Sequence, residues 1–313
     1  MKLALNLFGA FFLYKMSKLP SFLSKNDLVV VISPSGVVDR NRVNQGIEWL
    51  EYTGFQVEIS PNTFKDHFKF GGTHQERLDD LQYALDHPKA RAIYCTRGGF
   101  GITHIIDSLD WAQFKKNPKW IIGFSDITAL LHASYLNGFA SLHGSVLQGL
   151  TKLPDIYKKS IIESLSGDLK NIEGASIYHK IGSSKGELIG GNLSLLVHQI
   201  GTATELDYSG KILFIEEVAE PLYHIDRMML QLKRANILRG LAGLVIGQFS
   251  NLSEDKSIFG QSVEELILAH CKEYGFPIGF NFPFGHGNEN MALVHGSAVA
   301  LEVEARGARV IYV

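Results

Sequence analysis

Cysteine is scarce in this sequence, which has only Cys95 and Cys271 among 313 residues. The two lie far apart, and neither belongs to a C-x-x-C pair or to a Cys/His spacing typical of zinc. Cys95 ends the apolar run AIYC, which favours a small buried residue over a nucleophile. The sequence therefore predicts no disulfide framework, no metal site and no thiol enzyme.

An excess of charge of either sign is also lacking. Thirty basic and 32 acidic residues leave a net charge of −2, and the basic residues are scattered along the chain. Such a distribution gives no electrostatic surface for nucleic acid or for an anionic membrane. We expect a small, neutral or zwitterionic partner and no organic cofactor.

The N-terminus contains the candidate targeting segment, because a basic residue precedes an apolar stretch there, as in secretory signals. No small-x-small cleavage site follows, and the stretch is shorter than the roughly 20 residues that span a bilayer. We expect residues 1–25 to be an extension outside the fold, with Met16 as a candidate native start, and the protein to be cytoplasmic. A signal peptide is the alternative.

From Leu28 onward, short β-rich runs alternate with segments of helical periodicity. The predicted strands are LVVVIS, FQVEIS, ARAIYCT and KWIIGF. Their alternation with helices predicts an α/β domain over residues 26–150, with a parallel sheet covered on both faces. A Lys-rich helical connection over 151–180 then leads through shorter strands, SIYHKI and GELIGG among them, into a mixed, β-rich domain over 181–313.

Ser125 lies between a predicted buried strand and a helix, in WIIGFSDITALLHA. This position puts a hydroxyl at the carboxyl end of a sheet and beside a helix N-terminus, which suits a nucleophile. A serine before a helix is also a common N-cap. The G-x-S-x-G pattern of the α/β hydrolases is not matched, so this segment alone leaves both interpretations open.

A glycine-rich loop follows the strand AIYC in the segment RGGFG. It lacks the G-x-G-x-x-G spacing of dinucleotide sites and the lysine of phosphate-binding loops. A tight turn is one interpretation. The other is an oxyanion hole, in which the N–H of Gly98 or Gly99 acts with that of Asp126, the residue after the serine.

A serine nucleophile needs a base and a partner that orients the base. The candidates are Glu216, which ends the apolar strand ILFI, and His286, which lies in the glycine-flanked loop FGHGNEN. A solvated strand end and an incidental loop histidine are the alternatives. The order Ser, Glu, His matches one of the known triad orders.

Taken together, these segments resemble the LD-carboxypeptidases, peptidase family S66, which include muropeptide tetrapeptide carboxypeptidases and microcin C7 self-immunity hydrolases. The resemblance covers nearly the whole chain from Leu28. It rests on a helix with Arg77, Asp80 and Leu81 and on the segments ISPSG, RGGFG, GFSD, LHG, GELIGGNLSLL, FIEEVAEPLYHIDRMMLQL and FGHGNENMALVHG, in the family's order.

The resemblance implies a Ser125–Glu216–His286 triad, with Asp126 and either Gly98 or Gly99 forming the oxyanion hole. It selects Glu216 over Glu217, and strand alternation agrees that both cannot face one site. It also implies a Rossmann-like N-terminal domain, a β-rich C-terminal domain and an active site in the cleft between them.

The implied reaction is hydrolysis of the L,D-peptide bond that releases terminal D-alanine from murein tetrapeptides, by a homodimeric enzyme without a cofactor. Arg97 is the candidate for binding the substrate carboxylate, with a surface salt bridge as its alternative role. A microcin-type hydrolase that cleaves an aminoacyl-adenylate antibiotic and a nonhydrolytic anion-binding protein are the competing functions. The chain departs from the family at Ser145, where His-Gly-Pro is common, and this departure bears on substrate detail only.

Overall fold

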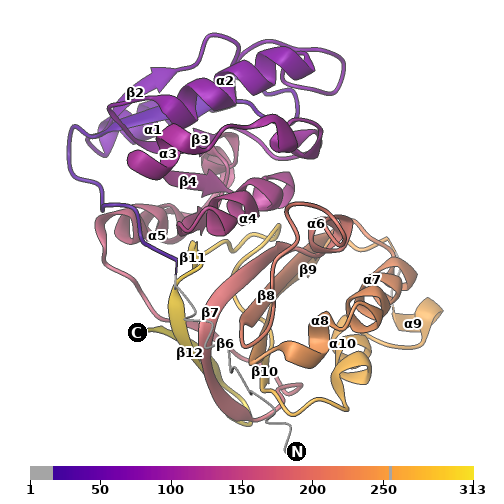
Figure 1. The fold of residues 1–313 in the computed structure, drawn as a ribbon. Helices are drawn as coiled ribbons and strands as arrows, with labels where there is room; N and C mark the ends of the chain where they lie inside the picture. The colour runs from indigo at the N-terminus through magenta and orange to yellow at the C-terminus, as the bar shows by residue number, and fades with distance from the viewer. Residues whose placement is uncertain (1–16, 254–255) are drawn as a thin grey trace, which may run out of the picture.

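The computed structural model describes residues 17–253 and 256–313, which form two sheet-centred domains. Figure 1 shows the N-terminal domain in indigo and magenta above the C-terminal domain in pink to yellow. Two domains, each with a sheet and helices, confirm the α/β prediction. The predicted extension falls partly on residues 1–16, which lie outside the described residues.

The N-terminal domain is built on a six-stranded sheet in the order β11-β5-β4-β3-β1-β2. The pairs among its first five strands are all parallel. These strands are β1 (Leu28–Ile32), β2 (Gln56–Ile59), β3 (Ala90–Cys95), β4 (Trp120–Gly123) and β5 (Ser141–His143). The helices are α1 (Arg40–Tyr52), α2 (His74–Asp86), α3 (Ala112–Lys116), α4 (Thr128–Leu136) and α5 (Asp155–Ser166).

Helices cover both faces of this sheet because successive strand residues point in opposite directions. Val31 packs in the core that contains Leu50 of α1, whereas its neighbour Ile32 packs in the core that contains Leu81 of α2. Strands β1, β3 and β4 are largely buried on both faces, which explains why they are apolar runs in the sequence, whereas the edge strand β2 is partly exposed.

Side-chain caps fix where the first two helices begin. The Asp39 carboxylate accepts hydrogen bonds from the backbone N–H groups of Asn41 and Arg42 at the start of α1. Thr73 and Glu76 bond reciprocally to each other's backbone at the start of α2. These caps also fix the loops that precede the two helices.

The C-terminal domain holds a seven-stranded mixed sheet in the order β10-β9-β8-β7-β12-β13-β6. The parallel part consists of β7 (Gly182–Asn192), β8 (Ile212–Val218), β9 (Gly243–Ser250) and β10 (Ile278–Gly279). The antiparallel part adds β12 (Ala298–Val303), β13 (Ala308–Tyr312) and β6 (Ile172–Gly174). The helices are α6 (Leu193–His198), α7 (Leu222–Arg234), α8 (Ile237–Gly240), α9 (Lys256–Phe259) and α10 (Val263–Cys271).

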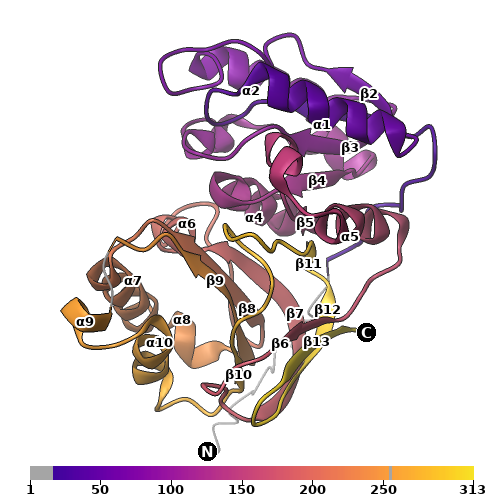
Figure 2. The same cartoon turned by 180° about the vertical axis from the view of Figure 1, so that it is seen from behind.

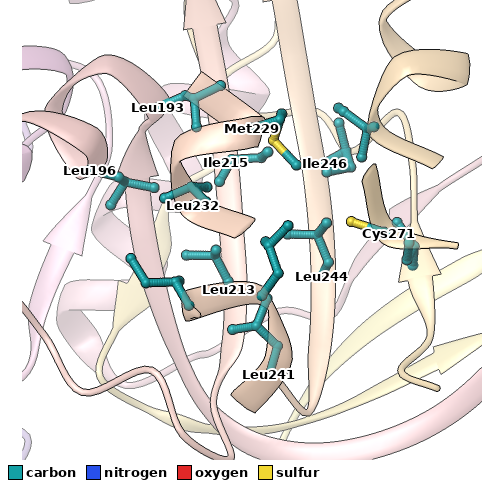
Figure 3. Close-up of a cluster of buried hydrophobic side chains, with 14 of the residues drawn as sticks. Leu193, Leu196, Leu213, Ile215, Met229, Leu232, Leu241, Leu244, Ile246 and Cys271 are labelled. Carbon is teal, nitrogen blue, oxygen red and sulfur yellow. The ribbon is translucent and has the colours of Figure 1, made fainter. Parts of the chain in front are cut away.

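A large apolar core joins one face of this sheet to its helices. Figure 3 shows Leu213 and Leu244 of two neighbouring strands beneath Met229 of α7, with Cys271 of α10 at the side. Both cysteines are free and buried, in agreement with the expectation of no disulfide framework. Cys95 packs in the core of the first domain.

The predicted strand SIYHKI, residues 176–181, is wrong. In this segment Lys180 forms an isolated bridge to Ile278, and the long strand begins only at Gly182. The segment crosses the end of β10, which is two residues long, so it finds no ladder to join. The side chains of Ile177 and Ile181 remain 79% and 68% exposed.

The chain returns to the first domain near its end. Strand β11 (Leu293–His295) pairs antiparallel with β5 at the edge of the first sheet, as the yellow strand beside β5 in Figure 2 shows. In the predicted connection, Ile161 and Leu165 of α5 pack into the first domain's core. The domain boundaries at 150 and 181 stay a prediction.

Candidate active site

The end of β4 brings Ser125 to the carboxyl edge of the first sheet. Phe124 is extended, and Ser125 then takes φ = 64°, in the left-handed region that residues other than glycine rarely adopt. The short 3-10 helix η3 (Ser125–Ile127) and α4 follow directly. Backbone strain of this kind is concentrated at functional sites, where the surrounding structure holds it in place.

The glycine loop lies directly against this turn. A Cβ placed on Gly98 would be 2.9 Å from Ser125 Cβ and 3.1 Å from Ser125 Oγ, so the approach requires glycine. Gly99 has φ = 100°, which also favours glycine. The N–H groups of these two glycines donate to no other residue within the described chain.

Two buried charged residues hold the glycine loop in place. The Asp126 carboxylate accepts a hydrogen bond of 3.0 Å from the N–H of Ile102, and burial raises the pKa of Asp126. From the other side, Arg77 Nη1 donates to the carbonyl groups of Pro34 and Gly101 at 2.9 and 2.7 Å. Asp126 therefore joins the serine turn to the end of the glycine loop, and Arg77 joins that loop to the segment after β1.

The second domain supplies a buried carboxylate–imidazole pair. Glu216 on β8 is fully buried, and its Oε2 lies 2.6 Å from His286 Nδ1. An ionised carboxylate only accepts, so Nδ1 carries the hydrogen and Nε2 remains for proton transfer. Burial lowers the pKa of His286, but the Glu216 charge and hydrogen bond outweigh it and leave that pKa above its ordinary value.

Glu217 points to the opposite face of β8. Its carboxylate accepts hydrogen bonds of 2.8 Å from Asn192 Nδ2 and from the backbone N–H of Ser194, at the start of α6. Burial raises the pKa of Glu217. Only Glu216 therefore faces His286, as strand alternation predicts.

Phe124 links the serine turn to the histidine. The centroid of its ring lies 4.5 Å from that of His286, which places the imidazole beside the residue that precedes Ser125. No hydrogen bond joins Ser125 Oγ to His286 in the described chain. Nucleophile–base hydrogen bonds are often long without substrate and tighten when it binds.

Arg97 folds back onto the first domain. It is half-buried, and its guanidinium donates a hydrogen bond to the carbonyl of Val37. The ion pairs found among residues 17–253 and 256–313 do not include Arg97, so the expected alternative of a surface salt bridge has no support there. Its role in binding substrate stays a prediction.

Sequence reasoning missed a hydrogen-bonded bridge between the domains. Glu289, three residues after His286, accepts bonds of 2.9 Å from Tyr157 of α5 and from Gln248 of β9. Gln248 also lines a cavity of about 530 Å³ in the C-terminal domain, which neither Ser125 nor His286 lines. The signal available in the sequence was the polar segment GNEN, because its glycine and that of the preceding FGH imply a loop that needs anchoring.

Among the described residues, no group of three or more His, Cys, Asp or Glu side chains has the arrangement to hold a metal ion. No helix there is long and apolar enough to cross a membrane.

Comparison with known proteins agrees with this geometry. Models of the LD-carboxypeptidase N-terminal and C-terminal domains match residues 29–144 and 185–301. The murein tetrapeptide carboxypeptidase of Pseudomonas aeruginosa is 30% identical over 286 residues, which cover 88% of this chain and 92% of that protein. The crystal structure of a muramoyltetrapeptide carboxypeptidase from Oxalobacter formigenes superposes with a TM-score of 0.83 at 27% identity, covering 90% of this chain and 98% of that one.

A more distant match has a different named activity. The microcin C7 self-immunity protein of Escherichia coli is 27% identical over 250 residues, covering 69% of this chain and 73% of that protein. Two family models, which together span well over half of the sequence, decide the assignment. The chain belongs to the LD-carboxypeptidase family.

Proposed function

We propose that this protein is a serine carboxypeptidase that releases terminal D-alanine from murein tetrapeptides by hydrolysing an L,D-peptide bond. The observation that carries the chemistry is the Glu216–His286 hydrogen bond of 2.6 Å, brought from the second domain to the Ser125 turn of the first. The substrate class follows from the family and from the murein tetrapeptide carboxypeptidase that is 30% identical.

In the proposed cycle, His286 Nε2 takes the proton of the Ser125 hydroxyl as Oγ attacks the scissile carbonyl carbon. Glu216 holds the imidazole in the productive tautomer and favours its protonated form. The proton then passes to the leaving amine of D-alanine, which leaves an acyl-enzyme. Water, deprotonated by the same imidazole, releases the acyl peptide and restores the serine.

The oxyanion of the tetrahedral intermediate needs preorganised donors. We assign this role to the N–H of Asp126 together with that of Gly98 or Gly99. The close approach of Gly98 to Ser125 and the free N–H groups of the glycine loop support the assignment. Two hydrogen bonds keep these donors in place: the Asp126 carboxylate accepts one from the N–H of Ile102, and Arg77 donates one to the carbonyl of Gly101.

We assign the terminal carboxylate of the substrate to Arg97. This guanidinium adjoins the glycine loop and carries a charge that no described carboxylate neutralises. Arg is the residue best suited to binding a planar carboxylate with two parallel hydrogen bonds.

A hydrolase of the microcin self-immunity type is the second candidate. Its chemistry would use the same triad on the amide bond of an aminoacyl-adenylate. The match to that protein covers less of the chain at lower identity than the match to the murein peptidase, so we rank it second. A nonhydrolytic anion-binding protein would not need the hydrogen-bonded Glu216–His286 pair, so this function is ranked last.

The test is incubation with L-Lys- and diaminopimelate-containing tetrapeptides, and separately with processed microcin, while D-alanine release and amide cleavage are measured. We expect D-alanine from at least one tetrapeptide with the wild type and none with Ser125→Ala. Cleavage of microcin alone would favour the second candidate. If the Ser125→Ala variant cleaves as fast as the wild type, the serine mechanism is wrong.

We also propose that the protein works as a homodimer in the cytoplasm. Both statements follow from the resemblance to the family. Light scattering after size-exclusion chromatography measures the mass in solution. Fractionation of cells that express the full chain measures its location.

A further inference from the structure

The second oxygen of Glu216 has no partner. Oε2 accepts the bond from His286, whereas Oε1 is fully buried and meets no donor in the described chain. Burying a carboxylate is costly unless both oxygens are hydrogen-bonded. Each such atom in a native structure therefore points to a donor, often reached through buried water.

His143, the histidine of the LHG segment, is a buried polar group on which the Glu216 charge acts. It lies on β5, is fully buried, and neither of its ring nitrogens has a partner among the described residues. Burial lowers the pKa of His143 to about 4, although the Glu216 charge acts in the opposite direction. The imidazole is thus neutral near pH 7 and has one N–H to donate.

Aromatic rings place His143 beside the Glu216–His286 pair. Phe214 and Glu216 are two residues apart on β8, so their side chains leave the strand on the same face. The His143 ring lies 5.0 Å from the Phe214 ring and 5.9 Å from the Phe124 ring, measured between centroids. Phe124 in turn contacts His286.

We propose that His143 is a positioning residue for the reaction, whose neutral imidazole donates its N–H to Glu216 Oε1 through one buried water. This bond keeps the carboxylate charged and aligned with His286. The proposal rests on the proposed function, since it gives His143 a part in the same hydrolysis. The groups that act on the His286 proton are then Glu216 and Glu217 from β8 and His143 from β5.

The chain offers a matched control in His295. This histidine of β11 is also fully buried, and neither ring nitrogen has a described partner. It pairs with Ser141 across the same sheet edge. The titratable groups that act on it are His132 and His143, and Glu216 is not among them. Replacing His295 therefore disturbs the same region without touching the carboxylate.

The kinetic experiment compares His143→Phe, His143→Gln and His295→Phe. We expect His143→Phe to lower kcat about tenfold or more with little change in KM, as for other residues that orient a catalytic partner. Without the donor, Glu216 attracts the His286 proton more strongly, so the acid limb of kcat/KM moves to higher pH. We expect His143→Gln to keep a hydrogen-bond donor and to recover much of the wild-type kcat. His295→Phe should leave kcat and the acid limb of kcat/KM near their wild-type values.

Equal effects of His143→Phe and His295→Phe would reduce His143 to a packing residue and overturn the proposal. Two further measurements do not depend on turnover, and the second of them does not depend on the folding of a variant. The far-downfield proton signal of His286 Nδ1–H in the wild type should move in His143→Phe and stay in His295→Phe. A high-resolution crystal structure of the wild type should show water between Glu216 Oε1 and His143, and its absence there overturns the proposal.

These readouts separate the two hypotheses. If no tetrapeptide is cleaved but the Nδ1–H signal moves as expected, the proposed substrate is wrong and the role of His143 stands. If the tetrapeptide is cleaved and the signal is unchanged in His143→Phe, the role of His143 is wrong and the function stands.

Discussion

Single side chains decide the chemistry of the proposed site, and we expect Ser125, Glu216 and His286 to act as a unit. When any one of them is removed, the other two no longer contribute to the rate, because the base then has no nucleophile or the nucleophile has no base. We expect Ser125→Ala and His286→Ala each to lower kcat on the order of ten-thousandfold. Combining them should cost little more. Steady-state kinetics with a tetrapeptide checks this, and additive losses would contradict it.

The Glu216–His286 pair also sets the pH dependence. The pKa of His286 is raised, and the base must be neutral to accept the serine proton, so activity is lost as pH falls through that raised value. Glu216→Gln removes the two largest causes that raise this pKa and leaves the smaller effect of Glu217 together with burial, which lowers it. We therefore expect the acid limb of kcat/KM to move to lower pH in Glu216→Gln, at a much reduced rate. An unchanged limb would mean that it reports another group.

Gly98 offers a steric test of the serine turn. Gly98→Ala places a methyl group 2.9 Å from Ser125 Cβ, so the serine or the loop must shift. We expect a loss of kcat of tenfold or more, on the order seen for misplaced catalytic groups, with little change in unfolding temperature. Gly275→Ala is the matched control, because nothing lies within 4 Å of its added Cβ. Equal activity in the two variants would show that the close approach of Gly98 to Ser125 is not needed for the reaction.

Secondary-structure elements were more predictable than their ends and their partners. Three apolar runs of the first domain became β1, β3 and β4, because a strand buried on both faces is apolar nearly throughout. The run FQVEIS became the partly exposed edge strand β2. SIYHKI was also predicted as a strand and is not one, since β10 gives it no partner long enough to pair with. Strand pairing depends on residues far away in the chain, which local composition does not contain.

The core beneath α7 supports the strand that carries Glu216. Met229 is fully buried against the apolar face of β8 and β9, as Figure 3 shows. We expect Met229→Ala to lower the free energy of unfolding by about 2–5 kcal/mol through lost burial and the cavity left behind. Chemical denaturation measures this loss. Leu230→Ala, at a 41% exposed position on the same helix, is the control and should cost far less.

The two domains are joined by more than their connecting segment. Strand β11 completes the edge of the first sheet, although it lies in the chain between β10 and β12 of the second sheet. No local pattern in LVH distinguishes this strand from its neighbours, so the sequence predicted the two domains but not this return of the chain to the first sheet. The proposed triad could be named only through the resemblance of its segments to a family. The partners of His143 and Glu289 could not, because burial and hydrogen bonding there depend on how the two domains meet.

Glu289 gives this domain contact a measurable consequence. Glu289 lies three residues after His286 in the chain. Its carboxylate accepts hydrogen bonds from Tyr157 of the first domain and from Gln248 of the second. Because these bonds are exposed, each contributes modestly, about 0.5–1.5 kcal/mol. We expect Glu289→Ala and Tyr157→Phe each to lower kcat/KM several-fold, and the double variant to lose little more than either, since the two residues share one bond.

A matched variant distinguishes this bridge from general surface effects. Lys158→Ala alters the residue next to Tyr157, but its ion pair with Asp155 lies within α5 and does not cross between domains. We expect wild-type kcat/KM from Lys158→Ala. A double-mutant cycle with a coupling free energy near zero between Tyr157 and Glu289 would show that the bridge does not hold the His286 loop. A clear coupling in kcat/KM would mean that the contact between the domains helps to set the position of the catalytic base relative to Ser125.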